Sequence, residues 1–164
     1  MIAWDARSRE ERILLNPAFC ATLLWNAASG HKLVNSLLSL EEAFLILPLV
    51  LPEMTRRSLP RDLRTSLPVW IEGNPIEQQR VAKRARATVP FTKSALLFGG
   101  VQGLLQFEGH NIVPVEEWSK SIKKLLPKTS DEVRVCTAKA AFVGKWFAKT
   151  GNSATVLAMM GVRP

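Results

Sequence analysis

Few side chains in this chain have the type and spacing that catalysis or metal binding requires. The two histidines, His31 and His110, have no second His, Cys or carboxylate at ligand spacing, so we expect no metal site. Cys20 and His31 could act as a nucleophile and its general base. Cys20 lies in an apolar stretch, however, which favours a buried thiol. The pairs Glu41-Glu42 and Glu116-Glu117 stand at expected helix starts, where negative charge complements the helix dipole. The sequence therefore predicts no catalytic residues and no enzyme.

Two glycine-containing segments were the candidates for phosphate binding. Residues 99–103 lack the Lys-Ser/Thr ending of a phosphate loop and indicate instead a helix end that approaches the next element closely. Residues 151–153 lead into a helix N-terminus, whose free N–H groups could hold an anion near Lys145 and Lys149. The alternative, an ordinary turn between helices, is favoured because short Gly/Asn/Ser turns are common. We expect no cofactor and no small-molecule substrate.

Positive charge is concentrated in the middle of the chain. The formal net charge is +8, and residues 55–93 alone hold nine basic and three acidic side chains, whereas residues 1–54 carry a balance of −2 and residues 94–164 of +4. This distribution suits a polyanion or an acidic protein partner, and a merely solvated basic face is the alternative. The candidate nucleic-acid-binding residues are Arg56, Arg57, Arg80, Lys83, Arg84 and Arg86.

Hydrophobic periodicity and capping residues predict a mainly helical chain. A helix is expected within 13–33, started or interrupted at Asn16-Pro17, with Gly30 as its stop. Ser39 with Glu42 forms a capping box for an apolar helix that Pro48 kinks or ends. Further helices are expected over 62–71, over 74–86 with Asn74 and Glu77 as its capping box, from Pro90 to about 99, over 116–127 and within 131–164.

Residues 104–115 predict a two-stranded hairpin around the turn at 108–111, with Pro114 at a strand end. The expected fold is thus α+β, mainly α with one short hairpin, in a single globular domain over 1–164. Helices followed by a hairpin is also the order of a winged helix-turn-helix domain. Within this one domain we distinguish the basic central region 55–93, the hairpin at about 104–115 and a C-terminal helical segment over 131–164.

The remaining bulk features favour a cytoplasmic protein. Cys20 and Cys136 are far apart in apolar patterns, as expected for buried free thiols in a reducing compartment. The N-terminus carries charged residues, among them Asp5 and Arg7, and lacks the apolar segment of a secretory signal. The longest apolar run, 43–51, is too short for a membrane span.

Several segments along the whole chain resemble one bacterial protein family. They are RILLNPAFC at 12–20, LPLVL at 47–51, TRRSLP at 55–60, GKWF at 144–147, GNSAT at 151–155 and GVRP at 161–164. The chain is similar here to the middle component of three-component ABC ATPase systems. The resemblance implies two partners, an ABC ATPase related to the DNA-organising, long-coiled-coil class and a third, effector component. It also implies a role as a non-catalytic adaptor in antiviral or conflict defence.

The alternative from another class is a stand-alone winged-helix DNA-binding regulator. In that hypothesis the helix over 74–86 contacts DNA and the Gly109-His110 turn is the wing.

The end of the chain, from Gly151 to Pro164, keeps an apolar helix almost to the terminus, where chains normally fray. We therefore expect this tail to dock, either on a partner subunit through Met159, Met160 and Arg163 or on the protein's own core. Leu45 and Phe147 lie in helical apolar patterns and are the expected core anchors.

Overall fold

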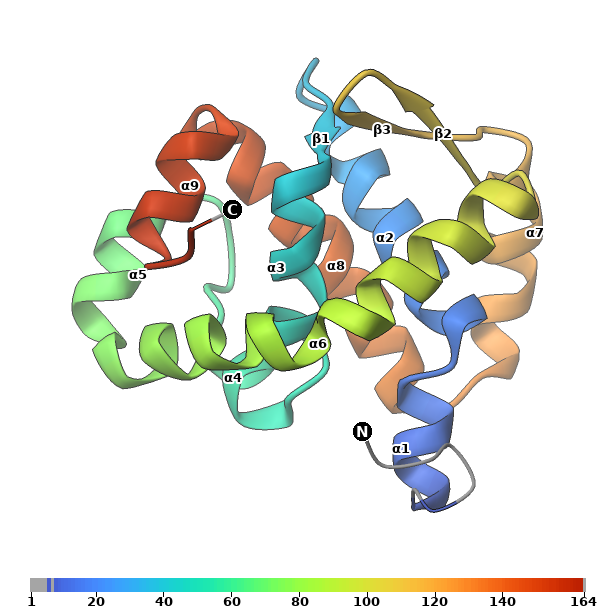
Figure 1. The fold of residues 1–164 in the computed structure, drawn as a ribbon, viewed down its shortest axis with the longest axis horizontal. Coiled ribbons are helices and arrows are strands. Elements are labelled where there is room, and N and C mark those ends of the chain that lie inside the picture. The colour runs from blue at the N-terminus through green and yellow to red at the C-terminus, as the bar shows by residue number, and fades with distance from the viewer. Residues whose placement is uncertain (1–5, 7, 164) are drawn as a thin grey trace.

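Four helices surround one apolar core in the computed structural model, which describes residue 6 and residues 8–163. They are α2 (Pro17–Lys32), α3 (Leu40–Val50), α6 (Pro75–Val101) and α8 (Asp131–Thr150). Figure 1 shows α3 in the middle of the molecule, with α6 crossing in front of it and α8 behind. The apolar sequence of α3 explains this central place, because a helix that is hydrophobic on nearly all sides must be covered on nearly all sides.

Shorter helices complete the fold around this centre. They are α1 (Arg9–Leu14), α4 (Glu53–Ser58), α5 (Leu67–Gly73), α7 (Trp118–Leu125), the 3-10 turn η2 (Leu126–Lys128) and α9 (Ser153–Met159). The mainly helical α+β fold expected from the sequence is confirmed. Asp5 and Arg7 of the charged N-terminus and Pro164 of the C-terminal tail lie outside the described residues.

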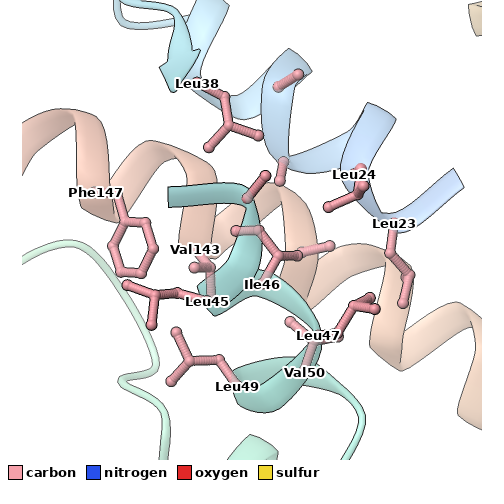
Figure 2. Close-up of a cluster of buried hydrophobic side chains, with 14 of the residues drawn as sticks. Leu23, Leu24, Leu38, Leu45, Ile46, Leu47, Leu49, Val50, Val143 and Phe147 are labelled. Atoms are coloured by element: carbon pink, nitrogen blue, oxygen red, sulfur yellow. The ribbon is translucent and has the colours of Figure 1, made fainter. Parts of the chain in front are cut away.

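The core side chains come from segments that are far apart in the chain. Figure 2 shows Leu45, Ile46 and Leu49 of α3 packed among residues of α2 and α8, including Leu23, Leu24, Val143 and Phe147. Leu45 and Phe147 are both fully buried, which confirms them as core residues. Cys20 and Cys136 are buried free thiols, as predicted.

The sheet has one strand more than the sequence predicts. The hairpin β2 (Leu105–Glu108) and β3 (Asn111–Pro114) forms as expected, with Gly109 at φ +59° in its turn. The additional strand β1 (Leu38–Ser39) pairs antiparallel with β3, Leu38 opposite Ile112, so the strand order is β1-β3-β2. A two-residue strand has no periodicity of its own, and the pairing ties the start of α3 to the hairpin.

Three predicted helix boundaries are wrong. Gly30 does not end α2 but lies inside it, where α2 touches α8. The two helices expected around Pro90 are one helix, α6, because Pro90 lies on its exposed side while Val81, Ala85, Ala95 and Leu96 continue one buried face through it. The helix expected over 62–71 is confined to α5, since the side chain of Asp62 binds Arg64 and holds that segment in a turn.

Helices α2 and α8 approach each other unusually closely at two glycines. A Cβ atom built on Gly144 would lie 2.8 Å from the carbonyl carbon of Ala27, and closer still to its oxygen. A Cβ atom on Gly30 would collide in the same way with the Ala141 carbonyl. Both collisions are with backbone, which cannot rotate away, so each of these positions requires glycine.

Candidate nucleic-acid and partner surfaces

Arg56, a predicted nucleic-acid-binding residue, is buried and has other partners. Its guanidinium donates to the carbonyl oxygens of Val50 (2.8 Å) and Leu51 (2.7 Å), and to the carboxylate of Glu132 (3.2 Å). The last carbonyl groups of an α-helix have no hydrogen-bond donor within the helix. At the end of α3 the Arg56 guanidinium is that donor. Only 6% of this residue is exposed. We therefore leave Arg56 out of the nucleic-acid surface and assign it a structural role.

Arg80 and Arg84 belong to a polar cluster between α4 and α6. Arg84 donates to the hydroxyl of Thr55 (2.6 Å), and this hydroxyl donates to Glu77 (2.7 Å). Arg80 pairs with the second oxygen of Glu77 at 2.5 Å. The Thr55 hydrogen bond, with smaller contributions from Arg80 and Arg84, lowers the pKa of Glu77. The negative charge of Glu77 therefore offsets part of the positive charge of these two arginines.

This cluster also replaces the predicted capping box at the start of α6. Glu77 turns to Thr55 and Arg80 instead of to Asn74. The amide of Asn74 donates to the carbonyl of Trp70 at 2.9 Å, and its side chain makes no cap hydrogen bond. Asn74 and Glu77 have the residue types and spacing of a capping box, but the Glu77 carboxylate accepts a hydrogen bond from Thr55 of α4 instead.

The exposed, uncompensated positive charge of α6 lies on Lys83, Arg86 and Lys93. Each is exposed, and none forms an ion pair with any residue that the structure describes. Spacings of three and seven residues place them on one side of the helix. We call Lys83, Arg86 and Lys93 the α6 basic surface. Lys93 was not among the predicted residues because Pro90 indicated the start of a separate helix there, although the seven-residue spacing from Arg86 places both residues on one side of a continuous helix.

Arg57 is the remaining candidate and is exposed on α4. Its guanidinium pairs with Glu53 one turn earlier, at 2.6 Å, and both side chains are more than half exposed. Such exposed pairs on a helix contribute only about 0.3–0.5 kcal/mol, so a stronger anion can displace Glu53.

The C-terminal tail packs on the protein's own core. Met160 is fully buried, and the amide of Gln78 in α6 donates to the Met159 carbonyl at 3.2 Å. Asn152 accepts hydrogen bonds from the backbone N–H and the hydroxyl of Thr155, so its side chain caps α9. Arg163 is exposed. Of the three predicted partner contacts, Met160 is thus used internally, Met159 is half-buried and Arg163 faces outward.

Cys20 and His31 do not form a nucleophile–base pair. They are separated along α2 by eleven residues, roughly 16 Å of helix. Burial raises the pKa of the Cys20 thiol to about 12, and its sulfur donates to the Leu14 carbonyl at 3.4 Å. In the part of the chain that the structure describes, no group of three His, Cys, Asp or Glu residues could hold a metal ion. Among the described helices, none is long and apolar enough to cross a bilayer.

His31 and Glu42 form a buried polar pair that joins α2 to α3. His31 Nε2 lies 3.6 Å from the Glu42 carboxylate, and His31 Nδ1 lies 3.3 Å from the Ser36 hydroxyl. Burial lowers the pKa of His31 to about 4 and raises the pKa of Glu42. His31 is therefore neutral in the folded protein at pH 7.

This pair predicts a loss of stability in mild acid. Between pH 6.5 and about pH 4, His31 is mostly protonated in the unfolded chain but mostly neutral in the folded protein. Proton binding therefore favours the unfolded state, and the free energy of unfolding falls as the pH falls through this range. The raised pKa of Glu42 acts in the opposite direction and offsets part of the loss. We expect a net loss of about 1–2 kcal/mol between pH 7 and pH 5, measured by urea unfolding. His31→Gln should flatten this dependence, whereas His110→Gln, in the exposed hairpin turn, should not. An equal slope in wild type and His31→Gln would contradict the assignment.

Comparison with known proteins identifies the family. No curated protein and no solved structure matches the chain. Among protein families, the one described as the ABC-three component (ABC-3C) system Middle Component 3 matches residues 4–164, nearly the whole sequence. This agrees with the resemblance that the motifs at 12–20, 47–51 and 144–147 carry, whose residues lie mainly in α1, α2, α3 and α8 of the structure. The chain therefore belongs to the Middle Component 3 family of ABC-three component systems.

Proposed function

We propose that the protein is a non-catalytic adaptor that links an ABC ATPase of the DNA-organising type to an effector component in bacterial antiviral or conflict defence. The observation that carries this proposal is the family match over residues 4–164, since a middle component is defined by the system it belongs to. Two surface features support it. The α6 basic surface offers uncompensated positive charge, and Arg163 remains exposed on a tail that is otherwise packed on the core.

Copurification tests the adaptor role directly. The full chain, the ABC ATPase and the third component of the same system are expressed separately, mixed and separated by size-exclusion chromatography. We expect one complex that contains all three, and the ATPase of an unrelated ABC system should stay apart. A chain that elutes alone under every condition would refute the adaptor proposal. It would favour the alternative, a stand-alone winged-helix regulator that uses α6 and the hairpin on DNA.

We propose further that the α6 basic surface contacts the phosphate backbone of nucleic acid. Reversing the charge of both Lys83 and Arg86 (Lys83→Glu/Arg86→Glu) should weaken binding to a short labelled DNA duplex by about tenfold or more. Each lysine or arginine that neutralises a phosphate releases counterions on binding, and the variant loses two such contacts. The slope of log affinity against log salt should fall by about two. Fluorescence anisotropy over a salt series measures both quantities.

A matched variant controls for net charge in this experiment. Lys123→Glu/Lys124→Glu on α7 changes the total charge equally but lies on another element. It should leave the affinity for DNA close to that of wild type. Equal losses in the two variants would show that DNA responds to net charge alone, and that α6 is only a solvated face.

A further inference from the structure

Helix α7 carries a second concentration of uncompensated positive charge. Lys120, Lys123, Lys124 and Lys128 are all exposed, and residues 118–128 include no acidic side chain. None of the four lysines forms an ion pair with a described residue. Lys120, Lys123 and Lys124 share one side of the helix, since they are three and four residues apart, and Ile122 on the other side is buried. This charge is separate from that of α6.

One of these lysines, Lys123, lines a mainly apolar groove of about 590 Å³. Its apolar lining comes from Trp25 of α2, Ile122 of α7, Leu126 and Pro127 of η2, and Ala138 and Ala141 of α8. Lys123 adds unpaired positive charge, whereas Arg134 in the lining is paired with Asp131. The Trp25 indole N–H donates to the Val115 carbonyl at 2.9 Å, and this hydrogen bond fixes the position of the indole ring in the groove wall. The groove therefore combines a fixed apolar wall with basic side chains.

We propose that this groove, the α7 groove, binds an acidic amphipathic segment of a partner protein. Charge complementarity defines the polar part of the partner, because Lys123 in the lining and the other three unpaired lysines of α7 and η2 favour carboxylates. The apolar lining defines the other part, because apolar side chains gain free energy by covering Leu126, Pro127 and Ala138, which are partly or fully exposed. A phosphate backbone would use the lysines and leave the lining exposed to water, so a protein segment fits the two features better than DNA does.

The test uses two labelled peptides and the full chain. The first peptide is an amphipathic helix with glutamates on one face and leucines on the other, and the second has the same glutamates with serines in place of the leucines. We expect the first peptide to bind at least about tenfold more tightly, because several leucines are buried only in that case. Fluorescence anisotropy at physiological salt measures the two affinities.

Two variants of the protein locate the binding site. Lys123→Glu/Lys124→Glu should weaken binding of the leucine-containing peptide by about tenfold or more, since two attractions become repulsions. Ala138→Trp fills the groove from an exposed position and should have a similar effect. The matched controls, Lys83→Glu/Arg86→Glu and Ala87→Trp on α6, should leave peptide binding unchanged. Circular dichroism melts verify that every variant is folded.

The proposal is wrong if the leucine-containing peptide does not bind, or if both peptides bind equally. It is also wrong if Lys123→Glu/Lys124→Glu loses as much affinity for DNA as Lys83→Glu/Arg86→Glu does, because the α7 lysines would then bind DNA. A dimer that Ala138→Trp converts to a monomer would assign the groove to a second copy of this chain instead. The peptide assay contains no ATPase, so failure of the adaptor proposal and failure of this one are distinguishable.

Discussion

Replacing Gly144 with alanine should lower the free energy of unfolding by about 3 kcal/mol or more. This loss is expected although alanine stabilises the interior of an α-helix by about 1 kcal/mol relative to glycine. The new Cβ atom would overlap the backbone carbonyl of Ala27 on α2. No side-chain rotation relieves this overlap, so α2 and α8 must separate along the interface where Leu23, Leu24 and Val143 pack. Urea unfolding at neutral pH measures the change, with the m-value as a check on two-state behaviour.

Gly73→Ala is the matched control for this prediction. Gly73 is the last residue of α5, and a Cβ atom there meets no atom within 4 Å. This variant should be as stable as wild type, or slightly more stable because alanine restricts the unfolded chain. If Gly144→Ala and Gly73→Ala unfold at the same urea concentration, the close approach of α2 and α8 is wrong.

Replacing Arg56 with methionine should cost about 2–4 kcal/mol of stability. Methionine keeps much of the side-chain volume but leaves the carbonyl oxygens of Val50 and Leu51 without the guanidinium that they accept hydrogen bonds from. It also removes the link to Glu132 near the start of α8. Thermal and urea unfolding would both record the loss, and α3 and α8 should lose protection from hydrogen exchange first.

The neighbouring arginine provides the control. Arg57→Met removes a more than half-exposed side chain and an exposed ion pair with Glu53, so the change in stability should stay below about 0.5 kcal/mol. The two variants remove the same charge one residue apart. A similar stability for Arg56→Met and Arg57→Met would contradict the structural role of Arg56.

Local signals in the sequence were sufficient for much of the fold. The Asn16 and Ser39 caps, the hairpin turn at Gly109 and the burial of Cys136 and Phe147 each depend on residues close together in the chain, and each is found as predicted. Gly99 also lies against Leu105 of the hairpin, as expected for a helix end that approaches it closely.

What sequence reasoning missed depends on contacts between distant segments. Arg56 and Arg57 are adjacent and chemically identical, and only the position of α3 and α8 decides that one is buried and the other exposed. Glu77 has the spacing of a capping residue, but Thr55 from α4 binds it. The groove beside α7 draws its lining from α2, α7, η2 and α8, so no single stretch of sequence could have indicated it.

The pairing of α2 with α8 has a consequence for how the chain is made. These two helices form the most extensive contact in the fold, yet roughly 100 residues separate the end of one from the start of the other. At synthesis rates of about 5–20 residues per second, about 5–20 seconds pass between the synthesis of α2 and that of α8. During that interval Leu23, Leu24 and Leu45 have no α8 to cover them. The nascent chain therefore passes through an aggregation-prone stage that ends only when α8, in the last fifth of the sequence, emerges from the ribosome.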